Sequence, residues 1–582
     1  MQKKWQLKPK IDRDFIDKFP EVNNIILQLL YNRGLKTEKE IDAFLFPNYD
    51  TEVLDPFLFK DMESAVKRVI SAIYKNEKIL IYGDYDADGI CSTAILFNVL
   101  KSLGVDVETY IPFREIEGYG LNKKIVQVFI KQKHDLIITV DCGVSNSEEI
   151  ALLKEQGIDT VILDHHKEPL KRPDAVAIIN PSLDDSGYPF RQLCGAGVVY
   201  KFIQALNIRL EEENSPIKLP PGYEKWLLDL VAIASIADIV NLTGENRIFV
   251  KYGLIVLEKT INSGLKKLVE SINYKSGIID TTFVGWRIVP RLNAAGRIEH
   301  ASLALNLLLE KEEKKAEKMV EFLEVNNKKR QQITENILNA ALSQIKDVSD
   351  QQKLLCIVGE KWPAGVVGLV AGRISDKYNR PTLVISREGG EKLQDAKFVG
   401  SGRSVQGFDI TDALKKCEKF LTRFGGHSQA CGFSIVGENN FLKFKKEMEK
   451  ISLEKLAEND LTPVMEIDTE INITDIDWRL WEDLDKFEPF GEGNEKPIFA
   501  SFGLRVEQIQ AVGIDGKHLR LKVSQREKMQ KLIGFSFGEW CSKLKNGDII
   551  DIVFELDINE WNGNRELQLK LVDLKLSEGL SD

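Results

Sequence analysis

Short, continuously apolar segments alternate with helical patterns over the first 180 residues of the chain, and this alternation constrains the fold most strongly. The apolar segments cover residues 78–82, 105–111, 136–140, 159–163 and 175–179. Strands that are apolar along their whole length are buried on both faces, as in a parallel sheet covered by helices on either side. The sequence therefore predicts a doubly wound α/β domain.

The rest of the chain predicts further domains, because 582 residues exceed the ~250–300 at which a single core stops growing. A charged helical pattern over 301–345 predicts a connecting helix. Residues 353–450 predict a second α/β unit, and short alternating strands follow from Val464. Asp515-Gly516 and Asn562-Gly563 favour two-residue hairpins there, as expected in a small OB-like barrel.

These patterns divide the chain into five predicted parts. They are a helical segment at 1–55, a catalytic α/β domain at 56–300, a connecting helix at 301–348, a second α/β domain at 349–455 and a barrel at 460–582.

Composition points to a cytoplasmic protein. The seven cysteines form no CxxC pair, which argues against a zinc finger, and their odd, scattered placement is typical of a reducing compartment. The charged N-terminus has no apolar segment behind it, and the most apolar stretch, Leu227–Leu242, is too short to span a membrane and contains two aspartates. We expect no membrane association. The net charge of −10 argues only mildly against a nucleic-acid partner, because local potential rather than net charge steers a strand.

Three aspartates, Asp84, Asp86 and Asp88, follow the first apolar segment. Ligands bind at the carboxyl ends of strands in such sheets, and side chains two residues apart point to the same side of an extended chain. We therefore expect the three carboxylates to converge on hard divalent cations. An EF-hand is excluded because Ile95 stands where its glutamate would be; a solvated acidic turn remains the alternative.

Further acidic and imidazole groups follow other predicted strands and one helix. Asp141 follows the strand at 136–140, and Asp164-His165-His166 follows the strand at 159–163. One histidine would bind metal and the other would face substrate, with Asp164 orienting a ring. Asp238, in an apolar helical stretch, is either buried and satisfied by a cation or an exposed or capping residue. Mixed carboxylate and imidazole ligands suit manganese or magnesium, and two such ions promote phosphoryl hydrolysis.

The order of these motifs resembles the DHH phosphoesterase superfamily and, more narrowly, the RecJ family of bacterial exonucleases. The resemblance covers about residues 50–450. Its motifs are Gly83–Gly89, Pro112–Arg114, Gly118–Leu121, Val140–Gly143, Asp164–His166, Ile179–Pro181, Cys194–Val198, Ala237–Asp238, Arg291–Arg297, Ser401–Ser404 and Gly425–His427.

The resemblance implies a 5′→3′ exonuclease that degrades single-stranded DNA to 5′-mononucleotides in DNA recombination and repair. It implies two divalent cations, preferably Mn²⁺, with Mg²⁺ as the other candidate. Asp84 and Asp86 would hold one ion, although Asp84 could instead contact a metal-binding residue without binding the ion itself. Asp88, His165 and Asp238 would hold the other ion, Asp141 would bridge both, and His166, oriented by Asp164, would contact the scissile phosphate.

The resemblance also implies residues that bind substrate. Arg291, Asn293 and Arg297 would grip phosphate, the alternative being a turn with an internal salt bridge. The second α/β domain, of the DHHA1 type, would contribute Arg373, Ser401, Arg403, Gly425, Gly426 and His427. The barrel would bind single strands through aromatic and basic residues, unless the aromatic ones are core: Phe535, Phe537, Trp540, Trp561, Lys517, His518, Arg520 and Lys522.

Other readings of the same motifs remain open. The chain could be a nanoRNase, pyrophosphatase or cyclic-dinucleotide phosphodiesterase of the same superfamily, although these usually lack the connecting helix and barrel. A non-catalytic DNA-binding scaffold is disfavoured because every expected metal-binding residue is present. Expected partners are single-stranded DNA, a single-strand-binding protein and a RecQ-type helicase, and we expect a monomer.

Overall fold

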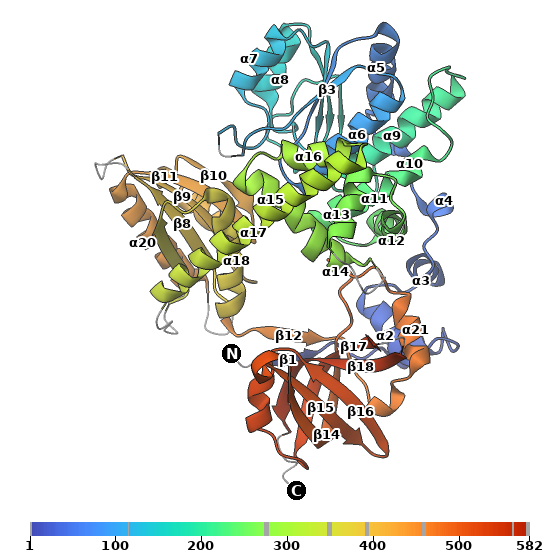
Figure 1. Ribbon diagram of the computed structural model, residues 1–582, viewed down its shortest axis with the longest axis vertical. Coiled ribbons are helices and arrows are strands. Elements are labelled where there is room, and N and C mark those ends of the chain that lie inside the picture. Colours follow the sequence, from blue (N-terminus) through green and yellow to red (C-terminus); the bar gives the residue numbers. More distant parts are fainter. Residues whose placement is uncertain are drawn as a thin grey trace. The chain divides into compact units, whose positions relative to one another are not determined.

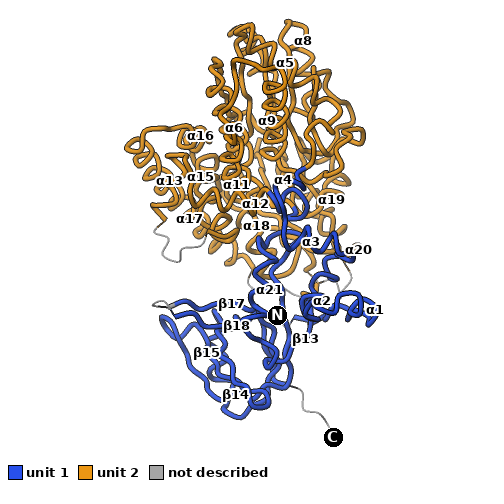
Figure 2. Tube along the Cα trace, turned by 90° about the vertical axis from the view of Figure 1, so that its right-hand side faces the viewer, with its two compact units in different colours: residues 1–53, 241–248, 464–582 blue, residues 54–240, 249–463 orange. Residues whose placement is uncertain are grey.

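The computed structural model forms two compact units (Figure 2), described here one at a time. The smaller unit comprises residues 1–53, 241–248 and 464–582, and the larger comprises 54–240 and 249–463. The described residues are 3–114, 116–272, 279–345, 352–389, 395–456, 461–561 and 564–577.

A parallel sheet of five strands begins the larger unit (Figure 1) and confirms the doubly wound class. Its order is β3-β2-β4-β5-β6, with strands Val107–Tyr110, Ile79–Tyr82, Leu136–Val140, Asp159–Leu163 and Ala177–Ile179. The strand order reverses between β2 and β4, so a ligand crevice is expected at their carboxyl ends.

Helices cover both faces of this sheet (Figure 1). Helices α7 (Lys123–Lys131) and α8 (Ser147–Glu155) bury apolar side chains on one face, against Tyr82 and Ile137. Helices α5 (Met62–Lys75), α6 (Ala87–Ser102) and α9 (Gly195–Glu212) pack on the other face. Because both faces are covered, the strands are buried throughout, as their composition predicts.

Helix α6 begins four residues before the predicted start near Cys91. The Asp86 side chain accepts hydrogen bonds from the backbone N–H groups of Asp88 and Gly89, which is the geometry of an N-cap. The expectation of an extended chain over Asp84–Asp88 is therefore wrong: Asp88 lies in the first helical turn.

A run of helices connects this sheet to the second one. They include α10 (Tyr223–Trp226), α11 (Leu228–Ala237), α12 (Gly244–Glu258), α13 (Ser263–Ser271), α14 (Thr281–Phe283), the π-helical η2 (Val284–Ile288) and α15 (Val289–Ile298). The single helix predicted over 301–345 is instead two, α16 (Ser302–Leu309) and α17 (Glu313–Gln344). The chain breaks at Glu310, whose carboxylate accepts from the next two backbone N–H groups.

The second sheet of this unit is mixed. Its order is β10-β11-β9-β8-β7, with strands Arg423–His427, Ala430–Val436, Lys397–Arg403, Thr382–Glu388 and Leu355–Glu360. Only β7 and β8 pair in parallel; the other neighbours are antiparallel. Helices α18 (Ala364–Tyr378), α19 (Ile410–Lys416) and α20 (Glu438–Lys455) pack on it, which matches the predicted second α/β unit.

The smaller unit contains a closed five-stranded barrel, which confirms the OB-like prediction. Its strands are β14 (Phe499–Val512), β15 (His518–Gln525), β16 (Lys528–Gly534), β17 (Ile549–Trp561) and β18 (Asn564–Leu576), and pairing of β14 with β17 closes it. The predicted two-residue turn at Asp515-Gly516 is wrong. Five residues join β14 to β15 and include a 3₁₀ turn (Ile514–Gly516). The Gly538 N–H donates to the carbonyl of Lys517, the last residue of this connection. Asn562-Gly563 lies outside the described residues.

The N-terminal segment belongs to the smaller unit. It begins with a strand, β1 (Lys4–Leu7), which pairs in parallel with β12 (Val464–Ile467). Short helices follow, including α2 (Asn24–Asn32) and α3 (Glu38–Leu45), and their apolar faces share a core with the barrel. Among the described residues, none of the helices combines the length and apolarity needed to cross a bilayer.

Candidate metal centre

The predicted metal-binding residues meet at the carboxyl edge of the parallel sheet. Asp84 follows β2, Asp141 follows β4 and His165 follows β5. Asp88 comes from the first turn of α6, and Asp238 caps the C-terminal end of α11. The site therefore occupies the crevice that the strand order predicts.

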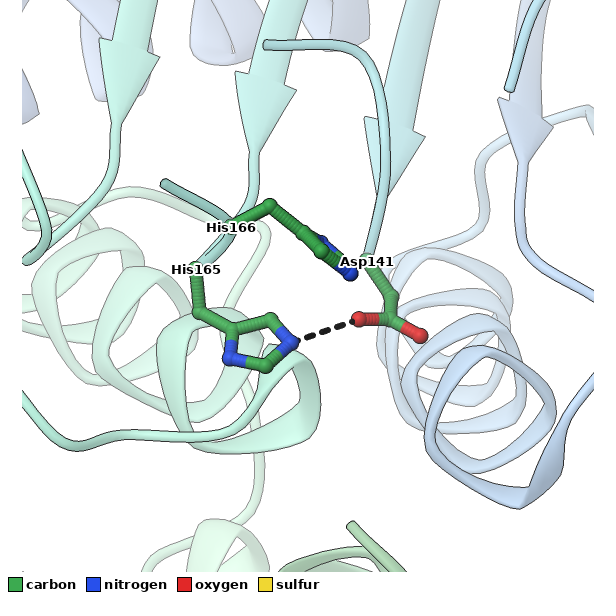
Figure 3. Close-up of side chains that lie close together, drawn as sticks. All are labelled: Asp141, His165 and His166. Carbon is green, nitrogen blue, oxygen red and sulfur yellow. Dashed lines mark ion pairs between the residues drawn. The ribbon is translucent and has the colours of Figure 1, made fainter. Parts of the chain in front are cut away.

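His165 approaches several carboxylates of this cluster, and Figure 3 shows its ring pointing toward Asp141. Its Nε2 is 3.1 Å from Asp141 Oδ1, 3.9 Å from Asp88 Oδ2 and 3.8 Å from Asp238 Oδ2. Three sets of residues place one potential ligand atom each within 4.8 Å of one another. The sets are Asp84, Asp86 and Asp141; Asp88, His165 and Asp238; and Asp141, His165 and His166.

Two buried carboxylate oxygens of the centre have no hydrogen-bond partner among the described residues. Asp84 Oδ1 and Asp141 Oδ1 are buried and make no hydrogen bond there, apart from the close approach of His165 to Asp141. A buried carboxylate without compensation is costly, so such oxygens need a cation or a proton. The donor set, mostly hard oxygen with one imidazole, fits Mn²⁺ or Mg²⁺.

The crowding of carboxylates raises their pKa values. Burial, followed by the charge of Asp86, raises the pKa of Asp84 well above its usual value and that of Asp88 to about 7. Burial and the charges of Asp88 and Asp86 raise the pKa of Asp141 strongly and that of Asp238 to about 8. Bound cations would relieve this repulsion and restore the ionised forms.

The two histidines have opposite electrostatic environments. Burial and the neighbouring His166 charge lower the pKa of His165 to about 4, so its ring is neutral and suited to bind metal. Burial is the largest single influence and lowers the pKa of His166, but the hydrogen bond to Asp164 and the charges of Asp164, Asp238 and Asp84 together outweigh it and raise the pKa to about 9. The Nδ1–Oδ1 distance of that bond is 2.8 Å.

Asp164 is held in place by several hydrogen bonds from the backbone. Its carboxylate accepts from the backbone N–H groups of Val144, His165 and His166. Burial would raise its pKa, but the hydrogen bond and charge of His166 lower it to about 2. Asp164 is therefore ionised, and its hydrogen bond to Nδ1 holds the His166 ring.

Backbone geometry supports the centre. Gly195 and Ala196, at the start of α9, donate their N–H groups to Asp88 at 2.7 and 2.8 Å. A Cβ at Gly195 would lie 2.7 Å from Asp141 Oδ1, so only glycine fits. Asp141 itself has a φ of 59°, an unfavourable conformation of the kind concentrated at functional sites. Asp238 is about a third exposed, at 33%, and is not the fully buried carboxylate that was one expectation.

Half-buried arginines gather beside the carboxylates. Burial, then the charges of Arg114, Arg330 and Arg403, lower the pKa of Arg297 to about 10, while Asp86 opposes the shift. Arg297 and Arg403 are among the predicted substrate-binding residues. Arg114 lies in a family motif that was given no role, and no sequence signal marks Arg330. Clustered guanidinium groups attract phosphate.

Other predicted phosphate-binding residues have internal partners. Arg291 forms a salt bridge with Glu324, as in the alternative reading, and Arg373 pairs with Glu335 at 3.1 Å. Asn293 Oδ1 accepts from the N–H of Ala87 at 2.9 Å and so supports the start of α6.

The second sheet brings further predicted residues toward the histidines. Gly425, Gly426 and His427 lie exposed on β10. Burial, then the charges of Lys167 and His166, lower the pKa of His427. Ser401 Oγ accepts from Arg403 at 3.2 Å and donates to the Cys431 carbonyl at 3.0 Å.

Sequence reasoning assigned no role to Tyr119, although its motif was noticed. Its hydroxyl lies 2.9 Å from His166 Nδ1 and donates to the Asp141 carbonyl at 3.3 Å. Tyr119 thus links the two strand ends that carry Asp141 and His166.

The barrel aromatics divide into two classes. Phe535 is exposed and packs edge-on against His518, with ring centroids 5.3 Å apart. Phe537 and Trp540 are partly buried against the core, so the core interpretation holds for both. Lys517 and Arg520 are exposed, and Lys522 is half-buried. The side chain of Trp561 lies outside the described residues.

Comparison with family models covers three parts of the chain. The DHH family N-terminal domain matches residues 78–235, the DHHA1 domain matches 350–453 and the RecJ OB domain matches 467–573.

Whole-chain relatives share both sequence and fold. The single-stranded-DNA-specific exonuclease RecJ of Bacillus subtilis is 34% identical, over 99% of this chain and 71% of its own length. That of Haemophilus influenzae is 32% identical, over 95% of this chain and 96% of its own. The crystal structure of RecJ in complex with Mn²⁺ from Thermus thermophilus has a TM-score of 0.83 and 28% identity, covering 99% of this chain and 80% of that one. The length, order and extent of these matches establish that this chain belongs to the RecJ family of single-stranded-DNA-specific exonucleases.

Proposed function

We propose that this protein is a metal-dependent exonuclease that degrades single-stranded DNA from the 5′ end to 5′-mononucleotides in DNA recombination and repair. One observation carries the proposal most. Buried carboxylates with unsatisfied oxygens meet a neutral imidazole at the sheet edge, beside a cluster of arginines. That combination suits cations on one side and a phosphodiester on the other.

Two divalent cations would occupy the carboxylate cluster, preferably Mn²⁺, with Mg²⁺ as the other candidate. Asp84 and Asp86 would hold one ion, Asp88, His165 and Asp238 the other, and Asp141 both. The three sets of converging ligand atoms are compatible with this division. When bound, such ions activate water and stabilise the charge that develops on the phosphoryl group.

His166 would act on the substrate. Its Nδ1 is held by Asp164, and its raised pKa keeps the ring protonated at neutral pH. The second nitrogen, Nε2, can therefore donate to a nonbridging oxygen of the scissile phosphate and stabilise its increasing charge. Tyr119 would help to hold this ring in place.

The arginine cluster would hold the strand near the centre. Arg114, Arg297 and Arg403 repel one another, so an incoming phosphate would relieve their unfavourable proximity. The exposed glycines and His427 of β10 would contact the same end of the strand, because glycine lets backbone N–H groups approach phosphate closely.

The barrel supports a polymer substrate over a dinucleotide. Exposed Phe535, Lys517 and Arg520 offer a ring and cations to a single strand. We further propose that the protein acts as a cytoplasmic monomer, with a single-strand-binding protein and a RecQ-type helicase supplying substrate. The five predicted parts remain our proposed domain division.

A cleavage time course on DNA labelled at either end tests the function. With Mn²⁺, label at the 5′ end should appear first, as a mononucleotide, and chelator should abolish its release. Earlier release of 3′ label would contradict the polarity. Equal cleavage of dinucleotides and long strands would instead favour the nanoRNase or cyclic-dinucleotide phosphodiesterase alternative.

A further inference from the structure

A highly exposed tryptophan lies in an unusual helical segment of the larger unit. Trp286 is 78% exposed, far more than is usual for so large an apolar side chain. It belongs to the π-helical η2, between α14 and α15 (Figure 1). π-Helical turns are rare and are often found at functional sites.

This segment packs against the helix that ends at a metal-site carboxylate. A Cβ at Gly285 would lie 3.5 Å from Ile236 Cγ2, so η2 packs against the last turn of α11. Asp238, one of the metal-site carboxylates, follows Ile236 by two residues. Trp286 therefore projects from an element in contact with the helix that carries Asp238.

A second exposed apolar side chain lies beside the same carboxylate. Ile239 is 68% exposed and has a φ of 56°. A β-branched residue in this conformation is an outlier, and such strain concentrates at ligand-binding and catalytic sites. The end of α11 thus carries an exposed apolar side chain next to one of the metal-site carboxylates.

We propose that Trp286 is a base-stacking residue, which receives the face of one nucleobase near the end of the strand being cleaved. A single strand alternates phosphates with flat apolar bases. The arginine cluster suits the phosphates, and the exposed indole suits a base of any identity, since every base has a π-face. Arg287, exposed beside it, adds a cation for the adjoining backbone. This inference rests on the proposed function and assigns to it a residue that neither the motifs nor the metal centre include.

Three variants of the full-length protein test the proposal. Trp286→Ala removes the ring, Trp286→Phe keeps one, and Trp226→Ala removes another surface tryptophan, half as exposed (39%), which precedes the opposite end of α11. A ten-residue helix is about 15 Å long, so Trp226 is well separated from the centre. We expect Trp286→Ala to raise the KM for single-stranded DNA at least about fivefold, from the usual strength of base stacking. Trp286→Phe should recover most of the loss, and Trp226→Ala should behave like the wild type.

Abasic substrates separate stacking from a structural role. A series of strands, each lacking one base at successive positions from the 5′ end, should weaken wild-type cleavage at one position. At that position alone, wild type and Trp286→Ala should have the same KM. A defect of equal size at every position, or a Trp286→Ala enzyme that matches Trp226→Ala, would overturn the proposal.

Binding without cleavage distinguishes this inference from the proposed function. In chelator, a fluorescent oligonucleotide should bind Trp286→Ala at least about fivefold more weakly than Trp226→Ala, even if no nuclease activity is found. Equal binding by the two variants would reject the stacking role, and absence of cleavage by wild type with Mn²⁺ would reject the proposed function.

Discussion

At the scale of single residues, Asp141 combines the features that define the metal centre. It is buried, has a left-handed backbone, contacts His165 and carries a strongly raised pKa. Its neighbours are four other carboxylates, so its own charge is tolerated only with compensation.

Replacing this carboxylate by an amide should separate stability from activity. We expect Asp141→Asn to raise the melting temperature in chelator. The amide has nearly the same shape as the carboxylate but cannot ionise, so the repulsion between buried charges is removed. The variant should lose at least about a thousandfold in Mn²⁺-dependent cleavage, the size expected for removing a metal-activated step. Calorimetry and the end-label assay measure the two effects. An Asp141→Asn enzyme with wild-type cleavage would contradict the metal assignment.

The pKa values predict how the metal-free protein responds to pH. Asp88, near 7, Asp238, near 8, and His166, near 9, all have raised folded-state pKa values. The folded state therefore binds more protons than the unfolded state, and stability falls as pH rises through these values. Asp164 titrates near 2 and His165 near 4 in the folded state, so neither reverses the slope above pH 6.5.

Melting curves in chelator should consequently shift to lower temperature between pH 6.5 and 8.5. Saturating Mn²⁺ should raise the melting temperature most at the high end of this range, because cations favour the ionised carboxylates. A melting temperature in chelator that rises over this range would show that the carboxylates are not electrostatically coupled as described.

Sequence identified most residues of the centre because each follows an apolar strand, and strand order then fixes their convergence. It could not identify Arg330, which lies in the charged α17 and becomes distinctive only through the arginines that tertiary folding brings near it. It also could not show that Arg291 is already paired, since Glu324 lies on a different helix.

At the scale of elements, local capping interactions explain why the predicted helix boundaries differ from those in the structure. Helix α6 begins early because Asp86 caps it, and the break before α17 occurs at a glutamate that bonds the following N–H groups. Apolar periodicity marks helix interiors but not such ends. The longer connection after β14 is likewise fixed by packing against Gly538, which no turn dipeptide records.

Arg247 is the element-scale feature with the clearest consequence for stability. Its guanidinium, buried in the smaller unit, donates to the carbonyls of Phe44, Lys486, Phe487 and Glu488. It thereby joins α3, the start of α12 and the segment that follows α21 (Trp478–Asp485). Burial lowers its pKa to about 9.

Arg247→Met should therefore destabilise the smaller unit by about 3 kcal/mol, since several buried carbonyls would lose their donor. Denaturant unfolding followed by the tryptophans of this unit would measure the change. The exposed Arg505→Met serves as the control, with an expected change below about 0.5 kcal/mol. A loss no larger than that of the control would show that the guanidinium does not clamp these segments.

At the scale of the whole molecule, length and patterning predict several domains but not their grouping. Residues 1–53 and 241–248 share a compact unit with the C-terminal barrel. For residues 1–53, that grouping depends on the β1–β12 pairing and a shared apolar core, contacts between segments more than 400 residues apart. Periodicity within short windows carries no information on such pairings.

The barrel should matter more for long strands than for short ones. We expect Arg520→Ala combined with Phe535→Ala to raise the KM for a strand of about 30 nucleotides several-fold, from lost stacking and charge. Cleavage of a four-nucleotide strand should be unchanged. Lys545→Ala removes another exposed barrel cation as a control. An equal effect on both lengths would mean that the barrel is not the surface that holds the distal strand.

The location of bound manganese tests the central claim most directly. Crystals of the full-length protein soaked with Mn²⁺ and measured at its absorption edge should show two anomalous peaks at the carboxyl edge of the parallel sheet. Asp141 should contact both, with Asp84 and Asp86 toward one ion and Asp88, His165 and Asp238 toward the other. Peaks elsewhere in the molecule, or a single ion that Asp141 does not contact, would contradict the account.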